Sequence, residues 1–419
     1  MKILIVSYEC WRDDTNGGNV LSNIFSGIDA EYAQIYCSGG EPSNTICKKY
    51  FQITDKMIFK GKNIGREFQL SNDGEDVTAN SAIAKRKTIT FGRNFLSIMR
   101  GFFWNIAKWR NSKLEKFILD FQPDIIFAPC YGITHMLKLD RYVQKVAKKP
   151  MISYVSDDTY SLKRFSLSPL FWLNLFNIRR ETRKTYPLYS LVYTMTNTQK
   201  EEYENYFNVP MKVLCKSGKF EKGTEKKLDK PIKMIYAGGI YIGRWKVLAK
   251  IKKSLEVLNK DLKKAELHIF TANQLSKRQK NALHDGVNSY VHPSISFAEL
   301  KRKYEESHIA LHVESFGLKN RLTTRLSFST KIMDCLESGC AVLAIGPKGQ
   351  AGIEYLKEND GAICVFDSKE ISKKLDDLIN DDKMITEYGE KAMNLGMKNH
   401  KKEDSIKMLT SDFLYFSSK

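Results

Sequence analysis

The chain has 419 residues, of which 42% are hydrophobic and 27% charged, a composition typical of globular proteins and unlike that of disordered ones. Its length exceeds what a single core usually fills and suits two domains of about 200 residues each. The 67 Lys and Arg residues outnumber the 48 Asp and Glu residues, which gives a formal net charge of +19. This excess favours anionic partners such as nucleic acid, a membrane surface or phosphorylated substrates, although a solvated surface explains any single lysine cluster equally well.

The cysteines and the N-terminal residues indicate a chain that stays inside the cell. None of the eight cysteines forms a CxxC pair or lies near clustered histidines, so the sequence predicts no metal site. Reduced, semi-buried thiols are expected in a chain of this size. The apolar run at residues 1–6 is too short for a secretion signal, and nowhere do about 18 uncharged apolar residues follow one another. We therefore expect a cytoplasmic protein without a transmembrane helix.

Short apolar strands alternate with amphipathic helices through the first half of the chain. The first strand is expected at residues 2–7, and a helix at 20–28 follows a loop that ends in Asn16-Gly17-Gly18. Further strands are predicted at 124–128, 151–155, 191–195 and 212–214, with helical stretches at 94–121 and 137–147. This alternation predicts an α/β domain built on a parallel sheet.

A charged break at residues 221–231 separates this half from a second half of the same design. Strands are predicted again at 232–237, 266–270, 309–313, 341–345 and 362–366, and the helical stretch that begins at Glu370 leads to aromatic residues that need a packing partner. The expected organisation is an N-terminal domain at 1–220 and a C-terminal domain at 232–399. A helical tail at 400–419 follows, for which the first domain offers a packing surface.

A glycine pair follows the first predicted strand of each half. Gly17-Gly18 and Gly238-Gly239 let the backbone approach a ligand closely, next to a helix N-terminus that can bind phosphate. Each pair alone is explained equally well by an ordinary tight turn. The second pair is followed by Arg244, whose guanidinium can make bidentate contacts to a diphosphate. An arginine that is merely exposed on the first turn of a helix would be disfavoured by the helix dipole.

The segment 325–343 is the richest in residues that can bind an anion. Its candidates are Arg325, Ser329, Thr330 and Lys331. The two hydroxyl residues are predicted to cap a helix, and the lysine lies in its first turn. Asp334 follows about one turn later and is expected to face the same side, while Gly339 ends the helix. A well-capped surface helix is the alternative explanation.

These motifs resemble those of the GT-B glycosyltransferases, specifically the retaining family-4 type found in capsule and exopolysaccharide synthesis. Members of that group have two Rossmann-like domains that face a cleft. Gly17-Gly18 matches their N-terminal glycine loop, and Arg244 takes the second of two basic positions that hold the donor diphosphate, while Gly239 stands at the first. Asp334 lies five positions before Gly339, as does the family's ribose-binding carboxylate, which is usually Glu.

The chain departs from the family pattern in two places. The family's other Glu, eight residues before the position of Asp334, falls on Leu326. Glu314 is the candidate substitute and is separated from that position by an inserted loop. The family's catalytic histidine of the N-terminal domain has no counterpart in register, since His135 lies nearby but is better explained as a structural residue.

The resemblance implies a glycosyltransferase that moves a hexose-type sugar from a nucleotide-diphosphate donor to a hydroxyl of a glycan or lipid-linked acceptor. Retention of configuration is expected, without a metal or another cofactor. Arg244 and Lys331 would be the catalytic cations that stabilise charge on the leaving diphosphate. The residues expected to bind the donor are Gly17, Gly18, Gly238, Gly239, Glu314, Arg325, Ser329, Thr330 and Asp334.

Three other classes of protein share some of these features. A nucleotide-sugar epimerase of the same fold needs the same diphosphate site but no acceptor surface. A metal-dependent transferase of the other major fold is suggested by Asp157-Asp158, although the two-half pattern argues against it. A nucleic-acid-binding protein is suggested only by the net charge, and the sequence has no recognition motif for DNA or RNA.

Two basic, aromatic stretches of the first half indicate an anionic membrane surface as a further partner. Nine Lys or Arg residues and six Phe or Trp residues lie between Lys85 and Lys116, and residues 163–183 have a similar mixture. Such stretches suit helices that lie in the plane of an anionic membrane, here the inner face of the cell membrane. For the first stretch, a helix whose aromatic residues fill the domain core is an equal alternative.

Overall fold

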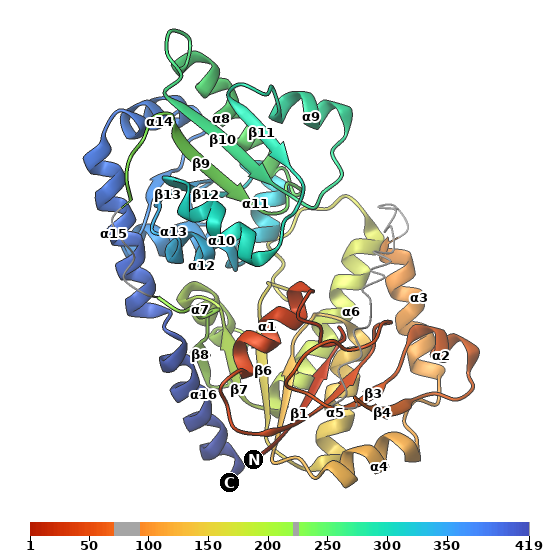
Figure 1. Ribbon diagram of the computed structural model, residues 1–419. Coiled ribbons are helices and arrows are strands. Elements are labelled where there is room, and N and C mark those ends of the chain that lie inside the picture. Colours follow the sequence, from red (N-terminus) through yellow and green to blue (C-terminus); the bar gives the residue numbers. More distant parts are fainter. Residues whose placement is uncertain (71–92, 221–225, 419) are drawn as a thin grey trace.

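The computed structural model describes residues 1–70, 93–220 and 226–418, so the basic residues 85–87 of the first aromatic stretch lie outside the described residues. Two α/β domains lie one above the other in Figure 1, each with a central sheet and helices packed on it. The strand order is β4-β3-β2-β1-β5-β6-β7-β8 in the N-terminal domain and β11-β10-β9-β12-β13-β14 in the C-terminal domain. The predicted class, two Rossmann-like α/β domains, is confirmed.

Both sheets are parallel apart from the pairing of β3 with β4 at one edge of the first sheet. The first sheet contains β1 (Lys2–Ser7), β2 (Glu31–Tyr36), β3 (Lys49–Gln52), β4 (Arg66–Gln69), β5 (Ile125–Pro129), β6 (Met151–Val155), β7 (Tyr189–Thr194) and β8 (Met211–Val213). The second contains β9 (Ile232–Ala237), β10 (Ala265–Phe270), β11 (Ser289–His292), β12 (Ile309–Val313), β13 (Ala341–Ile345) and β14 (Ile363–Val365). Every residue of β5, β6, β12 and β13 is buried, because helices cover both faces of each sheet.

The strands β2, β3, β4 and β11 were not predicted from the sequence. In β2 the apolar run is interrupted by Gln34, which is nevertheless fully buried. Its amide nitrogen donates to Ser7 Oγ at 2.7 Å, and its amide oxygen accepts from the Trp11 backbone N–H at 3.1 Å. A buried polar side chain with both groups satisfied costs little, so a strand tolerates it although the apolar pattern is lost.

Helices of the first domain are α1 (Asn16–Phe25), α2 (Asp55–Lys60), α3 (Arg93–Ile106), α4 (Ser112–Phe121), α5 (Thr134–Ala147), α6 (Pro169–Thr185) and α7 (Asn197–Glu204), with a short 3₁₀ turn at Tyr186–Leu188. Those of the second are α8 (Arg244–Leu258), α9 (Lys277–Leu283), α10 (Phe297–Glu305), α11 (Leu318–Thr324), α12 (Lys331–Glu337), α13 (Ala351–Glu358), α14 (Ile371–Ile379) and α15 (Asp382–Asn399). The predicted helical stretch 94–121 is thus two helices, because Asn111 caps a new helix by accepting from the Leu114 N–H.

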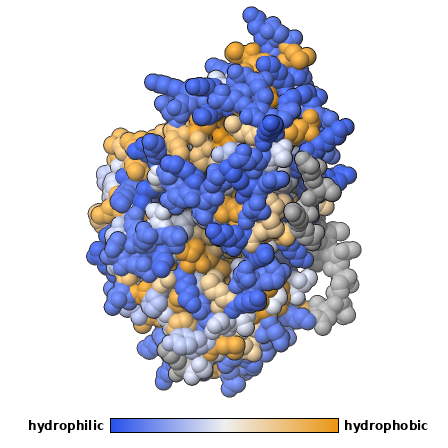
Figure 2. All heavy atoms as spheres, turned by 90° about the vertical axis from the view of Figure 1, so that its left-hand side faces the viewer, coloured by the Kyte–Doolittle hydropathy of each residue, from blue (hydrophilic) through white to orange (hydrophobic). Residues whose placement is uncertain are grey.

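The last helix, α16 (Lys402–Ser417), returns from the C-terminal domain and lies on the N-terminal domain (Figure 1). Phe413 is fully buried there and stacks on Phe25 with ring centroids 6.3 Å apart. The Asp412 carboxylate accepts a hydrogen bond of 2.7 Å from Tyr193. Figure 2 faces the side of the molecule along which α15 and α16 run, where hydrophilic residues predominate and hydrophobic ones are scattered.

No helix in the described part of the chain combines the length and the apolar character that crossing a bilayer requires.

Asp140 on α5 is a buried carboxyl group in the core of the first domain. Tyr189 donates to its Oδ2 at 3.2 Å, while Oδ1 has no hydrogen-bond partner among the described residues. Burial raises the pKa of Asp140 to about 8. The folded protein therefore holds a proton on this group from about pH 4 to pH 8, where the unfolded chain has lost it, and stability falls as pH rises through that interval.

Replacing Asp140 with asparagine is therefore expected to stabilise the protein, on the order of 1–3 kcal/mol near pH 7, because the cost of holding a carboxyl group there is removed. Urea unfolding of both proteins at pH 5 and pH 7.5 measures the effect. The gap between their midpoints should be larger at pH 7.5. An equal gap at both values would show that Asp140 keeps its charge in the fold.

Candidate active site

The edge of the C-terminal domain at the carboxyl ends of β9 and β12 has the geometry of a ligand site. The strand order reverses there, since β10 and β11 lie on one side of β9 while β12, β13 and β14 lie on the other. Ligands of open α/β sheets bind at the carboxyl ends of the strands at such a switch point. Gly238 follows β9 and Glu314 follows β12, so both lie at this place.

Lys331 lies directly against Gly238. A Cβ atom at position 238 would stand 2.0 Å from Lys331 Cε, so glycine leaves room for the lysine side chain in the position that it occupies here. Burial lowers the pKa of Lys331, and the nearby charge of Arg244 lowers it further. Among the described residues, no carboxylate lies within ion-pair distance of its ammonium group. An anion that reached this site would therefore meet a cation with no close counter-ion.

Arg244 begins α8 and forms a buried ion pair with Glu314. Its Nη2 lies 2.6 Å from Glu314 Oε1 and its Nε donates to Oε2 at 3.3 Å. The helix can start here because Gly243 has a φ of 78°, and a Cβ atom at that position would stand 2.5 Å from Ser315 Oγ. Burial raises the pKa of Glu314, although the charge of Arg244 opposes this. Glu314 thus orients the guanidinium and offsets its charge.

His312 lies in β12 beneath this pair and was not predicted. Its imidazole is buried, and its Nε2 has no hydrogen-bond partner among the described residues. Burial lowers its pKa to about 3, and the charges of Arg244 and Lys331 add to the shift. A polar residue inside the apolar run 309–313 was the signal that sequence reasoning could have used.

Asp334 on α12 faces the segment that leaves the N-terminal domain. Its Oδ1 lies 3.5 Å from Lys216 Nζ, which follows β8. Burial raises the pKa of Asp334, and the charges of Lys216 and Lys331 oppose the shift. The carboxylate is therefore held between the two domains, and nothing in the local sequence around Lys216 pointed to this contact.

The two hydroxyl residues before α12 do not cap it in the predicted way. Thr330 occupies the N-cap position, but its side chain makes no capping hydrogen bond. Ser329 Oγ accepts from the Lys331 backbone N–H at 3.4 Å. The prediction of a hydroxyl-capped helix is wrong for Thr330, whose backbone has helical rather than extended dihedral angles and so does not turn the side chain toward the helix end.

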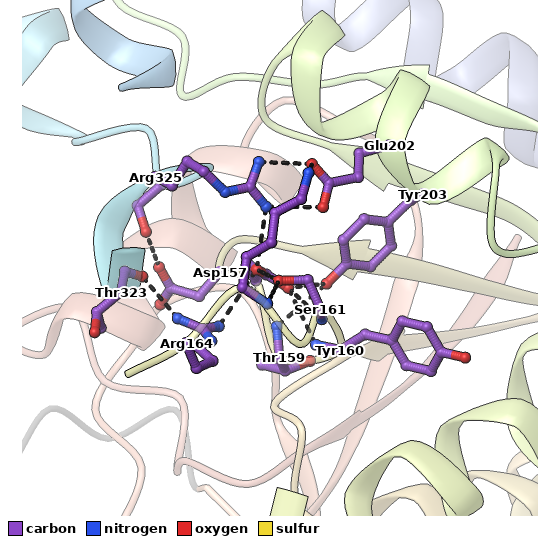
Figure 3. Close-up of polar contacts among 12 residues, drawn as sticks. Asp157, Thr159, Tyr160, Ser161, Arg164, Glu202, Tyr203, Thr323 and Arg325 are labelled. Carbon is purple, nitrogen blue, oxygen red and sulfur yellow. Dashed lines mark hydrogen bonds and ion pairs between the residues drawn. The ribbon is translucent and has the colours of Figure 1, made fainter. Parts of the chain in front are cut away.

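Arg325 points across the cleft to the N-terminal domain (Figure 3). Its two terminal nitrogens donate to the two carboxylate oxygens of Glu202 on α7 at 2.6 and 2.7 Å. Asp158 lies 3.6 Å from the same guanidinium. The structure thus groups Arg325 with acidic residues of the first domain and not with Arg244 and Lys331.

Two further contacts join the same segment to the N-terminal domain (Figure 3). Ser327 Oγ donates to Asp157 Oδ1 at 2.6 Å, and Arg164 Nη1 donates to the Thr323 carbonyl oxygen at 3.0 Å. Asp158, the second member of the acidic pair, accepts from the Ser161 hydroxyl and backbone N–H. Within residues 1–70, 93–220 and 226–418, no group of three or more His, Cys, Asp and Glu residues is placed to hold a metal ion.

Gly17 and Gly18 lie in the first turn of α1, which begins earlier than predicted. Thr15 is the N-cap, and its side chain accepts from the Gly18 N–H. A Cβ atom at position 17 would stand 2.3 Å from Glu9 Oε2, and one at position 18 would stand 1.9 Å from the Arg12 carbonyl oxygen. The glycine pair therefore allows the loop after β1 to pack tightly against the helix. The prediction that the helix begins after the pair is wrong, because Thr15 caps it three residues before Gly18.

A cavity of about 1340 Å³ lies between the domains beside Asp334. Its walls come from α1 and residues 216–219 of one domain and from α10 and α12 of the other. Of the predicted site residues, Asp334 alone lines it within the described structure. The volume is large enough for a nucleotide-sized ligand, which typically occupies a pocket of roughly 300–1,000 Å³.

Two Rossmann-like domains with a ligand site at the cleft between them define the GT-B class of folds. Solved structures with this architecture include trehalose-6-phosphate from E. coli bound with UDP-2-fluoro glucose, which is 11% identical over 99% of each chain with a TM-score of 0.63. Anabaena Alr3699/HepE in complex with UDP and glucose is 12% identical over 99% of this chain and 100% of its own, with a TM-score of 0.63.

A further similar structure is the α,α-trehalose-phosphate synthase (UDP-forming) from Burkholderia xenovorans in complex with glucose-6-phosphate. It is 9% identical over 99% of this chain and 100% of its own, with a TM-score of 0.60. At such low sequence identities, structural similarity shows only that the fold is shared.

Residues 250–409 match the family model described as glycosyl transferase-like. No curated protein sequence matches the chain. The matched residues contain Glu314, Lys331 and Asp334, while Arg244 lies just before them. Together with the fold, this match confirms the resemblance to the GT-B glycosyltransferases that the sequence motifs indicated.

Proposed function

We propose that the protein transfers a hexose-type sugar from a nucleotide diphosphate to a hydroxyl of a glycan or a lipid-linked acceptor. The observation that carries the proposal is the cationic centre at the switch point, where Lys331 lies against Gly238 beside the ion pair of Arg244 and Glu314. The glycosyl transferase-like match over 250–409 supports transferase chemistry and does not favour the epimerase alternative. The similar structure of Anabaena Alr3699/HepE is in complex with UDP and glucose or with UDP-glucose, which makes uridine nucleotides the first donors to test.

The reaction breaks the bond between the sugar C1 and a phosphate oxygen and forms a bond from C1 to the acceptor oxygen. Negative charge develops on the leaving diphosphate, and the acceptor hydroxyl proton passes to a phosphate oxygen. Lys331 is the cation that can stabilise this charge most directly, because Glu314 already offsets the charge of Arg244. We propose that the reaction retains configuration and needs no metal, and that Asp334 binds the nucleotide ribose.

A transfer assay with UDP-hexoses and glycan acceptors tests the function. We expect release of the nucleoside diphosphate that depends on the acceptor and continues in excess chelator. Release of a new nucleotide sugar without acceptor would instead identify an epimerase. Loss of activity in chelator, with recovery on adding a divalent cation, would reject the metal-free mechanism.

Replacing Asp334 with alanine is expected to weaken binding of the nucleoside diphosphate by about 10- to 100-fold, since hydrogen bonds to charged groups contribute about 1.5–3 kcal/mol. The effect on kcat should be smaller, because a ribose contact exists in both the ground state and the transition state. Calorimetric titration measures the affinity. Lys216→Ala is the matched control, since it removes the partner of Asp334 without touching the proposed ribose contact. Equal effects of both substitutions would assign Asp334 a structural role.

We also propose that the reaction takes place at the surface of an anionic membrane, where a lipid-linked acceptor is available. The exposed apolar side chains of α3 and α6 and the exposed basic side chains of α6 support this location, because they lie on the domain that holds the acceptor in the resembling family.

A further inference from the structure

Helix α3 has a buried side and an exposed apolar side. Trp104 is 1% exposed, and its indole nitrogen donates to Asp55 Oδ1 at 2.9 Å, so it belongs to the core. Phe95, Phe102 and Ile106 are 52%, 55% and 64% exposed. Their spacing of seven and then four residues places them on one side of the helix. The core therefore accounts for only part of the aromatic residues in this stretch.

Helix α6 lies beside α3 and continues the exposed apolar surface. Ser97 Oγ of α3 donates to Asn174 Oδ1 of α6 at 3.3 Å, and the two helices stand side by side in Figure 1. Leu173 and Phe176 are 49% and 54% exposed, and Arg180 follows them on the same side of the helix. Each helix thus presents apolar side chains to the outside, and on α6 these are followed by a basic one.

The loop 162–168 before α6 adds the most exposed of the large hydrophobic residues in the described structure, Leu167, which is 90% exposed. Phe165 in the same loop is also exposed. The loop is held in place by Trp172, whose indole nitrogen donates to the Ser166 carbonyl oxygen at 2.9 Å. Because the backbone is already ordered, burying these side chains against a partner costs little conformational entropy.

Basic residues gather where α3 and α6 approach α5. Lys138 donates a hydrogen bond to Asn105 at the end of α3. The charges of Arg141, Arg180 and Arg110 lie close enough to lower the pKa of Lys138, although burial is the larger cause and Glu181 opposes the shift. Arg183 and Lys184 add further exposed positive charge at the end of α6. Only Glu181 among these groups is acidic, and its carboxylate is shared between Arg141 and Arg180, so the cluster keeps a net positive charge.

We propose that α3, α6 and the loop 162–168 form a docking surface for an anionic lipid bilayer. The apolar side chains enter the interfacial region, and the adjacent basic side chains contact lipid head groups. A second copy of the chain fits this surface less well, because a two-fold contact would bring the basic cluster against itself. This inference rests on the proposed function in one respect, namely that the membrane supplies the lipid-linked acceptor. Lipid binding itself needs no sugar transfer.

Sedimentation of the full-length protein with vesicles tests the surface. The protein should pellet with phosphatidylglycerol vesicles at low salt, be released at high salt, and stay in solution with phosphatidylcholine vesicles. We expect binding to weaken about tenfold or more in each of two double variants. Phe102→Ser/Ile106→Ser removes apolar side chains that enter the interfacial region. Arg180→Glu/Lys184→Glu reverses the charge of two basic side chains that contact lipid head groups. The matched controls are Val257→Ser/Leu262→Ser and Lys253→Glu/Lys260→Glu on the exposed side of the C-terminal domain.

Any of three outcomes would contradict the proposed docking surface. These are a wild-type protein that does not pellet, controls that weaken binding as much as the test variants, or test variants that change only the oligomeric state in analytical ultracentrifugation. Transfer to a water-soluble acceptor is measured on the same proteins. Unchanged transfer with lost vesicle binding supports the surface, whereas vesicle binding by a wild-type protein that transfers no sugar rejects the proposed function and leaves the surface standing.

Discussion

Alanine in place of Lys331 is expected to lower kcat by about 10²- to 10³-fold, the usual effect of removing one fixed electrostatic donor from a transition state. The ammonium group lies at the switch point beside Gly238 and has no close counter-ion among the described residues. Its contribution should appear as charge develops on the leaving diphosphate, so kcat should fall more than nucleotide affinity.

The fold should survive this change. Burial disfavours the charged form of Lys331, so losing it removes a cost of folding and leaves no carboxylate without its partner. Steady-state kinetics and thermal unfolding measure the two effects, and Lys253→Ala, an exposed lysine on α8, is the control for removing a positive charge from this domain. Near-normal turnover of the Lys331→Ala protein would reject the assignment of the cationic centre.

Replacing Arg244 with methionine is expected to destabilise the protein by about 3–5 kcal/mol, because Glu314 is left as a buried carboxyl group without its cation. Burial already raises the pKa of Glu314, and loss of Arg244 raises it further. The folded variant then binds a proton that the unfolded chain releases above about pH 4.3. Its stability should therefore fall as pH rises, and the deficit relative to wild type should be larger at pH 8 than at pH 5.

The double variant Arg244→Met/Glu314→Gln separates stability from function. Without a buried charge, it should recover most of the lost stability, because replacing both partners of a buried pair costs much less than removing one. Sugar transfer should remain low in both variants. Urea unfolding at the two pH values and a transfer assay provide the readouts. A single variant as stable as the double variant at pH 8 would show that the Glu314 carboxyl group without its cation does not destabilise the fold.

The parts of the fold that were predictable from the sequence are those buried on both faces. The strands β6, β12 and β13 begin and end where predicted, since a central strand of a parallel sheet is a continuous apolar run. Strands nearer a sheet edge, such as β11, carry polar residues and lack that signal. The start of α1 was misjudged because glycines usually mark a loop, whereas here Thr15 caps a helix that contains them.

The candidate site was predictable as a set of residue types and not as a set of contacts. Glycines after strands and a lysine near a helix start are local patterns, so the sequence shows them directly. The partner of Arg325 is Glu202, which is 123 positions away, and no local pattern links the two. A cation predicted to bind the donor therefore turned out to be paired across the cleft, and only the three-dimensional fold could show it.

The contacts drawn in Figure 3 have a mechanical consequence. The segment 315–330 connects Glu314 at one end to Lys331 at the other, and its middle is bound to the first domain through Arg325 and Ser327. A hinge motion that widens the cleft must either break these bonds or pull on the segment, and so strain the spacing of the two residues that flank it. A ligand that prefers one spacing of Glu314 and Lys331 therefore also prefers one angle between the domains. By thermodynamic reciprocity, the factor by which the ligand shifts the equilibrium between two interdomain angles equals the factor by which its affinity differs between them.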